Sequence, residues 1–513
     1  MFTTLSYDQR GRKIGMNDPA MGVWSYAYNA VGELVRQTDS LGQISTMGYD
    51  ALGRMTSKNE PDLKSTWYYD RNVNGYPCGN KSVGKLCEAW ADNGYRRSHS
   101  YDSLVRLYST GTWQDSSQSQ SKISVGYDAN TGRMNSQTWP TGYYASYGYS
   151  TLGYLQTVNG SGSGMPATQL DNLKYDSQGR LTSYRQGGRI TTVKEFDPAT
   201  GRLKDIQAQV DGQAAGSVFK QTYSYDSLSN LTAKSDANTG VQESYGYDSL
   251  NRLRTYTSLG GSVSPPTSTQ VVYDARGTII YKSDVGRYWY DSQRPNRLAN
   301  ITLEGYAGAQ ALTGTRALSY VFDDYGSTAK SNGSVAMGNG NLMYTVSHDN
   351  ASGKHTVRRE SYTSFNMPLE IKYGNIGAAQ NSPAGFTSDR TLSFAYGPEY
   401  QRVKQVVTLS GNAPSQMMGG TTWYLHGDNN SLLFEREVKA SGITEQQHFL
   451  QAAGMTFALV VTRTGSGISG ANADRNMRPA QSEYFQRDYL GSIAKYRPEF
   501  PAKGFATFDE ARA

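Results

Sequence analysis

The chain has 513 residues, of which 50 are basic and 44 acidic, giving a formal net charge of +6, and it is rich in glycine (55 residues) and tyrosine (39 residues). No apolar run approaches the ~20 residues of a membrane-spanning helix. The charges are spread along the chain without the Lys/Arg stripe of a nucleic-acid-binding surface, and the aromatic content argues against disorder. At about 150 residues per domain, length alone predicts three or four domains.

A short motif recurs along the chain and argues against that domain count. Its centre is a Tyr-Asp pair, usually followed by glycine and then by arginine or a long apolar residue. The spacing is regular, because Tyr7, Tyr28 and Tyr49 are 21 residues apart. The clearest copies contain Tyr7, Asp8 and Gly11; Tyr49, Asp50, Gly53 and Arg54; Tyr101 and Asp102; Tyr127, Asp128 and Gly132; Tyr175, Asp176, Gly179 and Arg180; Tyr225 and Asp226; Tyr247 and Asp248; Tyr273 and Asp274. A unit of this length predicts one β-hairpin.

Each copy predicts a strand, a tight turn and a returning strand. Alternating tyrosines, as in Ser-Tyr-Ala-Tyr28, put their rings on one face of the first strand. The Asp carboxylate accepts hydrogen bonds from backbone N–H groups just ahead, and glycine then takes a positive φ at little steric cost. Where glycine is missing, Asn230 and Asn251 are predicted to replace it. The arginine is expected to lie across a tyrosine ring of the neighbouring repeat.

One hairpin cannot bury its apolar face alone, so successive hairpins are expected to pair edge to edge. The sequence therefore predicts an all-β fold in which the hairpins form one long, twisted and coiled sheet. In this fold the repeated residues act as scaffold, with tyrosine for packing, Asp and Gly for turns, and arginine for bridging rings.

The two cysteines, Cys78 and Cys87, lie nine positions apart. They predict either a disulfide that closes the loop, which implies an oxidising destination, or two free thiols in a hairpin. The same loop, Gly79–Leu86, nearly matches a phosphate-binding P-loop. Leu86 stands where a Ser or Thr must hold Mg²⁺, so nucleotide binding is not expected.

Other patterns with catalytic or binding chemistry are weak. Gly465–Gly470 has the glycine spacing of a dinucleotide-binding turn but no helical stripe after it, so it predicts a surface loop. The five histidines lack metal-ligand spacing, and no metal or cofactor is expected. The pairs Asp323-Asp324 and Glu435/Glu437 are candidates for a paired-carboxylate hydrolase site, although Asp is present in nearly every repeat.

The repeats resemble those of the RHS, or YD-repeat, family over roughly residues 5–330. Three later segments, Ser393–Lys404, Thr422–Asp428 and Glu483–Ser492, resemble the RHS-associated core, with Tyr489 in place of its usual histidine. The resemblance implies a spiralling β-sheet that closes into a hollow shell, commonly around a C-terminal toxin of bacterial polymorphic toxin systems. It divides the chain into a repeat region at 1–330, a less regular continuation of the sheet at 331–420, a core segment at 421–492 and a divergent tail at 493–513.

The chain also departs from the family pattern. Self-cleaving members carry an Asp-Pro-x-Gly-Leu-type signature after the core, whereas Asp18-Pro19 and Asp197-Pro198 lie far upstream and neither precedes Gly-Leu. No recognisable toxin domain follows Ser492. We therefore expect a partial or open hollow shell whose partner is a toxin domain or missing RHS sequence that completes it.

Three classes of function remain at this point. The first is a structural shell of a secreted or surface-delivered toxin, with no enzymatic activity of its own. The second is an extracellular repeat protein that binds surface glycans on its tyrosines, and the third is a polysaccharide hydrolase. Met1–Asp8 lacks the regions of a signal peptide, so export is expected to be directed by other sequence or by a secretion apparatus.

Overall fold

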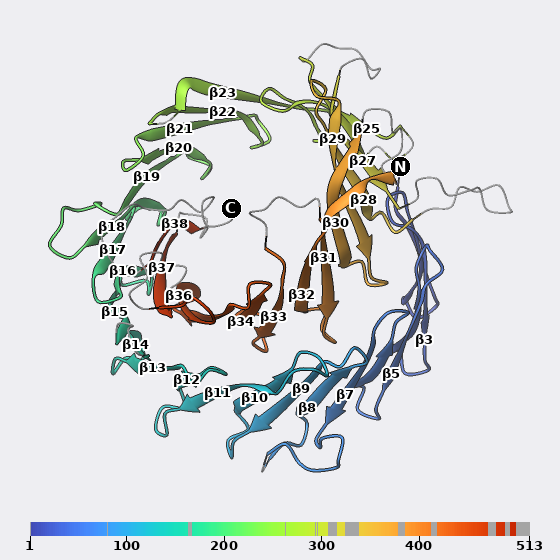
Figure 1. Ribbon diagram of the computed structural model, residues 1–513, viewed down its shortest axis with the longest axis vertical. Coiled ribbons are helices and arrows are strands. Elements are labelled where there is room, and N and C mark those ends of the chain that lie inside the picture. Colours follow the sequence, from blue (N-terminus) through green and yellow to red (C-terminus); the bar gives the residue numbers. More distant parts are fainter. Residues whose placement is uncertain are drawn as a thin grey trace. The chain divides into compact units, whose positions relative to one another are not determined.

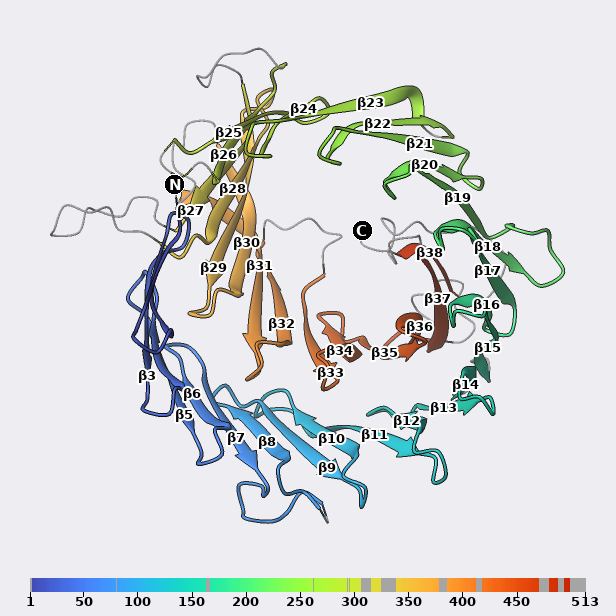
Figure 2. The same ribbon diagram turned by 180° about the vertical axis from the view of Figure 1, so that it is seen from behind.

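The computed structural model describes residues 2–79, 81–162, 167–261, 263–292, 294, 296–305, 315–323, 338–377, 385–411, 418–469, 479–487 and 493–498. Over these residues the chain forms 38 β-strands and no α-helix (Figure 1, Figure 2). No helix in this part of the chain is long and apolar enough to cross a membrane. The predicted all-β fold is confirmed.

The first ten strands are β1 (Thr4–Tyr7), β2 (Lys13–Asp18), β3 (Gly22–Tyr28), β4 (Leu34–Thr38), β5 (Ile44–Tyr49), β6 (Met55–Asn59), β7 (Lys64–Tyr69), β8 (Leu86–Ala91), β9 (Arg96–Tyr101) and β10 (Leu107–Trp113). The next thirteen are β11 (Ser121–Tyr127), β12 (Met134–Thr138), β13 (Tyr144–Tyr149), β14 (Leu155–Ser161), β15 (Thr168–Tyr175), β16 (Leu181–Gln186), β17 (Ile190–Phe196), β18 (Leu203–Val210), β19 (Phe219–Tyr225), β20 (Leu231–Asp236), β21 (Val241–Tyr247), β22 (Leu253–Gly260) and β23 (Val263–Tyr273).

The second half of the chain continues with β24 (Ile279–Lys282), β25 (Gly286–Tyr290), β26 (Leu298–Thr302), β27 (Arg316–Phe322), β28 (Leu342–His348), β29 (Lys354–Tyr362), β30 (Pro368–Gly377), β31 (Thr387–Tyr396), β32 (Arg402–Leu409) and β33 (Gly420–His426). The last strands are β34 (Leu432–Lys439), β35 (Thr444–Ala452), β36 (Met455–Thr464), β37 (Ala480–Arg487) and β38 (Ile493–Pro498).

Strands that follow one another in sequence pair antiparallel in one extended sheet, as in β3–β4, β4–β5 and β5–β6. In most odd-numbered strands the register shifts by one residue just before a terminal aromatic residue, for example between Gly48 and Tyr49 or between Glu195 and Phe196. Because successive strands run in opposite directions, the turns that lead from an odd to an even strand all lie at the same end of the strands. We call this rim of the sheet the Tyr-Asp edge. The turns from an even to an odd strand form the opposite edge.

The strands gather into two compact units. Unit 1 comprises Met1–Ser121, Val272–Tyr424 and Lys439–Ser441, and unit 2 comprises Lys122–Val271, Leu425–Val438 and Gly442–Ala513. Each unit therefore combines early strands with late strands: β1–β10 with β24–β33 in unit 1, and β11–β23 with β34–β38 in unit 2. These units cut across the sequence blocks predicted at 1–330, 331–420 and 421–492.

The cores show how early and late strands combine. In unit 2, the largest cluster joins Trp139, Tyr147 and Tyr184 from early strands and turns to Phe434 and Phe457 from late strands. In unit 1, a smaller cluster joins early-strand residues such as Leu63 and Tyr95 to Val403 of β32. Both clusters bury aromatic and aliphatic side chains that a single sheet layer would leave in water.

Candidate functional site

The repeat turn is built around one carboxylate. At Asp50, the backbone carbonyl accepts from the Gly53 N–H (3.0 Å), while Oδ1 accepts from the N–H groups of Leu52 (2.9 Å) and Arg54 (3.0 Å). Oδ2 accepts from Arg54 Nε at 2.7 Å. The same set of bonds recurs at Asp8, Asp102, Asp176 and Asp248. One aspartate thus satisfies the turn backbone and fixes the first residue of the returning strand.

This arrangement stabilises the ionised carboxylate. The backbone N–H of Arg54, followed by its side chain and the N–H of Leu52, holds the pKa of Asp50 below its usual value of 3.8. The pKa of Asp8 is lowered in the same way by the backbone N–H of Arg12. These aspartates are turn elements whose acceptor oxygens are already occupied.

The tyrosine before each turn bonds to the hairpin before it. The Tyr49 hydroxyl donates to the carbonyl of Leu34 at 2.9 Å, and the Tyr101 hydroxyl to Leu86 at 2.9 Å. Tyr28, Tyr149, Tyr175, Tyr247, Tyr290, Tyr362 and Tyr396 make the same kind of bond. The acceptor is always near the start of the preceding even strand, so each tyrosine joins its own hairpin to the previous one.

Arginines of the returning strands lie over aromatic rings of the next repeat, as the sequence predicted. Arg54 stands 4.6 Å from the Tyr69 ring centroid and Arg180 stands 4.5 Å from that of Phe196. Tyr49, Tyr101, Tyr127, Tyr175, Tyr225, Tyr247 and Tyr273 are half-buried, whereas Tyr7 in the first hairpin is 54% exposed. The repeat residues therefore form contacts between hairpins.

At one of the two turns where asparagine was predicted to replace glycine, the residue with positive φ is not the one that the sequence predicted. Gly11, Gly53, Gly132 and Gly179 have positive φ, and Asn251 takes this conformation with a φ of 59°. The prediction for Asn230 was wrong, because Ser229 has the positive φ of 77°. Asn230 instead occupies the arginine position, where its backbone N–H and side-chain amide both donate to Asp226. In the third repeat, Val105 takes a φ of 64°, which is unfavourable for a β-branched residue.

In other repeats the aspartate accepts from different neighbours. The turn at Asp128 is one residue longer, and Thr131 supplies both a backbone N–H and a hydroxyl. Asp274 accepts from the Thr278 N–H and pairs with the Arg276 side chain at 2.8 Å.

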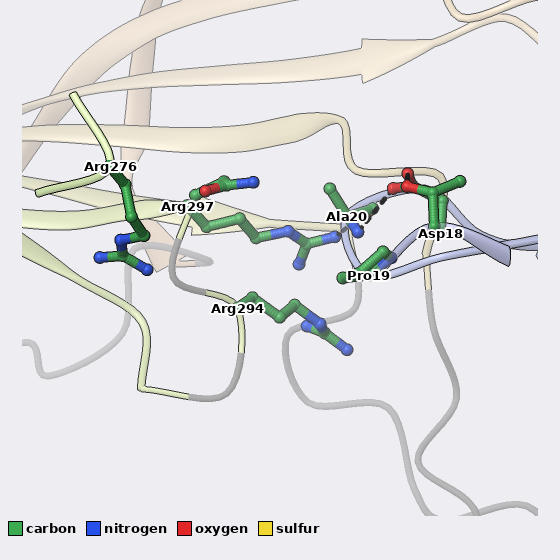
Figure 3. Close-up of a pocket in the computed structure, with 8 residues that line it drawn as sticks. Asp18, Pro19, Ala20, Arg276, Arg294 and Arg297 are labelled. Atoms are coloured by element: carbon green, nitrogen blue, oxygen red, sulfur yellow. Dashed lines mark hydrogen bonds between the residues drawn. The ribbon is translucent and has the colours of Figure 1, made fainter. Parts of the chain in front are cut away.

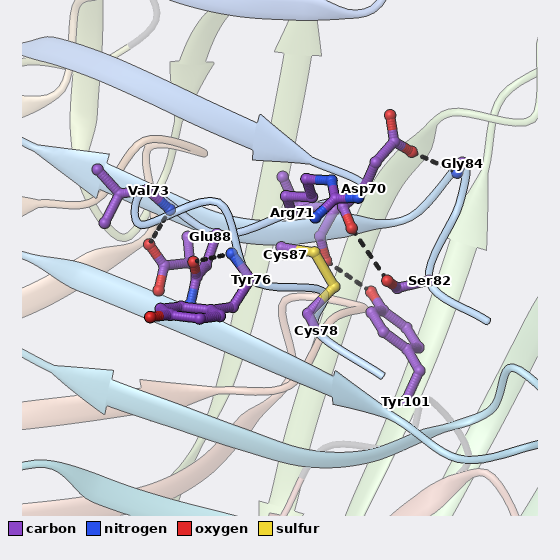
Figure 4. The surroundings of a disulfide bond; sticks show 12 residues. Asp70, Arg71, Val73, Tyr76, Cys78, Ser82, Gly84, Cys87, Glu88 and Tyr101 are labelled. Carbon is purple, nitrogen blue, oxygen red and sulfur yellow. Dashed lines mark hydrogen bonds between the residues drawn. A yellow bond between two sulfur atoms is a disulfide. The ribbon is translucent and has the colours of Figure 1, made fainter. Parts of the chain in front are cut away.

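The sequence left open whether Cys78 and Cys87 form a disulfide or remain two free thiols. The structure has the disulfide, which closes the loop between β7 and β8. Cys78 and Cys87 are bonded, with a Cα–Cα distance of 5.4 Å (Figure 4). At one side Asp70 accepts from Arg54 and from the Gly84 N–H, and at the other the buried Glu88 accepts from the Val73 N–H (Figure 4). The former P-loop candidate is therefore a closed loop that is bonded to its own hairpin and, through Asp70 and Arg54, to the preceding turn.

In unit 1, turns on the Tyr-Asp edge of the late strands dock on the opposite edge of the early strands. Ser364, in the turn between β29 and β30, donates from its N–H and hydroxyl to Asp62 in the β6–β7 turn. Tyr400, in the next such turn, donates to Glu60 at 2.6 Å and stacks on Phe365 with ring centroids 4.3 Å apart. Burial raises the pKa of Glu60.

A further contact of a late turn with an early turn lies beside a pocket at the turn between β2 and β3. Arg297, from the turn between β25 and β26, donates to the carbonyl of Ala20 in the β2–β3 turn at 2.6 Å (Figure 3). Arg297 is buried and lies 4.9 Å from the Phe322 ring centroid.

The pocket is also lined by Arg276, Arg294 and Asp18. Burial, together with the charge of Arg294, lowers the pKa of Arg297. Asp18 bonds internally to Thr3, Ala20 and Met21.

Unit 2 repeats this edge-on-edge contact with a buried histidine. Trp139, in the β12–β13 turn, donates to the carbonyl of Leu433 at 2.9 Å. His448 of β35 is fully buried; its Nδ1 donates to the carbonyl of Val460 (2.8 Å), and its Nε2 lies 2.7 Å from the Thr141 hydroxyl. Burial lowers the pKa of His448 to about 4. The ring is therefore neutral at physiological pH and joins a late strand to an early turn.

The two carboxylate pairs considered for hydrolysis belong to different units. Asp323 belongs to unit 1 and accepts from the Asn339 N–H, while Asp324 lies outside the described residues. Glu435 and Glu437 are two apart on β34 in unit 2, with Glu445 of β35 opposite Glu437. Burial and these two like charges raise the pKa of Glu435 to about 7. Within the described ranges, no group of three His, Cys, Asp or Glu side chains could hold a metal ion.

Sequence reasoning missed the docking residues, because each pairs with a residue roughly 300 positions away. Trp139 and Thr141 carry no repeat signal, and His448 was one of five unremarkable histidines. A usable signal existed at Phe365, which places an aromatic ring at a turn position where the other copies have an aliphatic or a polar side chain. The segment Asp488–Ser492 and most of the tail at 493–513 lie outside the described residues.

Comparisons with known proteins agree with this geometry. The family model named RHS Repeat matches residues 28–62, which confirms the resemblance to that family. No curated protein matches the chain. Solved structures align with 97% of the chain: TcdB2-TccC3-TEV (TM-score 0.70, 16% identity), TcdB2-TccC3 without its hypervariable C-terminal region (0.65, 15%) and a Photorhabdus luminescens Tc holotoxin pore carrying a TccC3 mutation (0.66, 15%). The chain spans 24% of the length of each matched chain, and the likeness establishes the fold.

Proposed function

We propose that this chain is a length of shell wall that encloses a toxin domain in a bacterial toxin system. The observation that carries the proposal is the construction of the sheet. Hairpins are joined to one another by tyrosine hydroxyls, and the edges of early strands are covered by late strands of the same chain. The polar side chains of the repeats thus bond one hairpin to the next and form a continuous sheet, as the wall of a container requires.

The comparisons support the toxin context. The structures with this fold carry the names of TcdB2-TccC3 complexes and of a Tc holotoxin, and one lacks a hypervariable C-terminal region. We infer that the present chain likewise acts outside the cell that makes it, with a toxin domain or further RHS sequence as its partner.

We further infer that the chain has no enzymatic role of its own. The repeat carboxylates are held by turn backbone and arginine, as at Asp50. The glycan-binding alternative requires free tyrosine faces, whereas the hydroxyls of Tyr28 and Tyr49 bond to neighbouring strands and Arg12 lies over the Tyr28 ring.

Protection from protease tests the enclosure. The chain would be coexpressed with the polypeptide encoded immediately downstream, and the purified complex treated with a nonspecific protease. We expect the downstream polypeptide to survive longer in the complex than alone, while a tag fused to the exposed first hairpin is removed at the same rate from the complex and from this chain alone. Equal digestion of the downstream polypeptide with and without this chain would contradict the proposal.

A further inference from the structure

The pocket beside the turn between β2 and β3 is lined by three arginines. Arg294 and Arg297 come from the turn between β25 and β26, and both side chains extend towards the turn that holds Pro19 and Ala20 (Figure 3). Arg276 lines the same pocket from the turn between β23 and β24. All three turns belong to unit 1. A guanidinium group carries a fixed positive charge and a planar fork of donors that matches the oxygens of a carboxylate or a phosphate.

Other contacts between the late and early parts of unit 1 show what a late donor meets there. In four of them it donates to an early carboxylate: Asn339 to Asp39 (2.7 Å), Tyr400 to Glu60 (2.6 Å), Ser364 to Asp62 (2.8 Å) and Lys404 to Asp115 (2.7 Å). Arg297 donates instead to a neutral acceptor, the backbone carbonyl of Ala20. The docking contact at the pocket thus brings a cation to an uncharged oxygen.

The carboxylates of the neighbouring turns accept from their own turns. Asp18, which lines the pocket, accepts from the N–H groups of Ala20 and Met21. Asp274 accepts from the side chain of Arg276 at 2.8 Å. These two acids are therefore satisfied locally, each within its own turn.

Two further acids, Asp291 and Asp323, lie near Arg297 and attract its charge. Asp291 accepts from the Arg294 N–H at 3.0 Å, and Asp323 accepts from the Asn339 N–H at 2.9 Å. Burial and the like charge of Arg294 outweigh both acids, so the pKa of Arg297 is lowered. An anion bound beside Arg294 and Arg297 would relieve this repulsion.

We propose that the pocket binds a small oxyanion, whose phosphate or carboxylate group is held by Arg294, Arg297 and Arg276. The bound group has the part that Asp62 has for Ser364, that of a negative acceptor for a late donor at the early edge. Because it offsets the charges of neighbouring cations, its binding should also strengthen the contact between the two turns. The proposal goes beyond the enclosure of a toxin and does not depend on it.

Isothermal titration calorimetry of the purified full chain tests this inference. Inorganic phosphate and malonate are the titrants, at a constant ionic strength set with KCl so that general screening is equal in all runs. We expect the wild type to bind one equivalent of at least one of them, and the tighter binder identifies the recognised group as phosphate or carboxylate. Arg294→Gln should weaken binding at least about tenfold, because a charged hydrogen-bond donor is lost. Arg276→Gln should weaken it less, since Asp274 already pairs with that arginine.

Arg10→Gln is the matched control. Arg10 follows Asp8 by two positions, as Arg276 follows Asp274, and both arginines are exposed, but Arg10 is not among the residues that line the pocket. The control should bind the anion like the wild type. Circular dichroism and equal unfolding midpoints without anion would show that all variants are folded.

Hydrogen exchange of the wild-type chain gives a second measurement that needs no variant. A saturating concentration of the bound titrant should slow exchange in the turn between β2 and β3 and leave the turn between β8 and β9 unchanged. A wild type that binds neither anion would overturn the inference, as would equal weakening in Arg10→Gln and Arg294→Gln. Neither result bears on enclosure of a toxin, which protease protection reports.

Discussion

At the scale of single residues, the turn aspartate and the residue with positive φ determine how well each repeat closes. Asp50 connects the turn backbone to Arg54, and Gly53 takes the conformation that other residues disfavour. The motif letters predicted these roles because all of the contacts are local in sequence. The exception at Asn230 arose because its side chain reaches the aspartate as arginine does, leaving Ser229 to adopt the left-handed conformation.

Replacing Asp50 with asparagine should lower the denaturation midpoint at neutral pH, because the charged acceptor of Arg54 is lost. The pKa of Asp50 is held below 3.8 in the folded chain, so its contribution is present above that pH and is lost as the pH falls through the folded-state pKa. Chemical denaturation at several pH values should show the two proteins converging in acid. Ser150 holds the aspartate position with a neutral hydroxyl, so the effect of Ser150→Ala should not depend on pH.

Replacing Val105 with glycine should stabilise the chain by about 1 kcal/mol, because Val105 has a φ of 64° and glycine adopts this conformation without steric cost. The change is measured as a higher midpoint of urea denaturation. The neighbouring Leu104→Gly replacement lacks this benefit and serves as the control. Equal effects at the two positions would show that the backbone conformation of Val105 costs nothing.

At the scale of elements, hairpin pairing and edge docking differ in how far they reach along the sequence. Pairing of consecutive strands follows from a motif repeated at intervals of 17–32 residues, so both the strands and their order were predictable. Docking of β34–β37 on β12–β16 depends on side chains such as Trp139 and His448, which meet only after both sets of hairpins have formed. No local pattern specifies such a pair, and this is why the sequence missed it.

The disulfide loop gives one prediction at this scale. Replacing Cys78 and Cys87 together with serine should lower stability by about 3 kcal/mol, because the closed loop of about ten residues restricts the unfolded chain. Denaturation with and without a reductant measures the effect. The wild type in reductant should match the variant, and the variant itself should not respond to reductant.

The buried His448 gives a second prediction at this scale. The pKa of His448 is about 4 in the folded chain against an ordinary 6.5, so the unfolded chain takes up the proton first as the pH falls. Stability should therefore be full above pH 6.5 and fall by about 3 kcal/mol towards pH 4. His448→Gln should flatten this dependence. Denaturation midpoints measured from pH 7 to pH 4 decide the matter.

At the scale of the whole molecule, each compact unit depends on late strands to complete a core begun by early strands. Phe434 is 1% exposed and packs in the same cluster as Trp139 and Tyr184, which are early residues of unit 2. The discontinuity of the units could not be predicted from the sequence, because the repeat motif is the same in both. The sequence blocks describe where the motif is clear, whereas the units describe which strands share a core.

Truncating Phe434 to alanine should cost roughly 3 kcal/mol or more in unit 2 and leave unit 1 unchanged. Hydrogen exchange should quicken in β13 and β16, with no change in β6 and β9. Phe394→Ala, which empties part of a cluster in unit 1, should give the reverse pattern. Faster exchange in both units for either variant would show that the chain unfolds as one cooperative body.

The tyrosine bond to the preceding hairpin gives assembly a direction. Tyr49 reaches Leu34 and Tyr101 reaches Leu86, each 15 residues earlier in the chain. A hairpin leaving the ribosome thus finds its binding partner already made and needs nothing that has yet to be synthesised. We expect the early sheet to grow hairpin by hairpin during translation, with its opposite edge uncovered until the late strands emerge some 300 residues later. That interval is when the nascent chain is most open to aggregation and has most need of a chaperone.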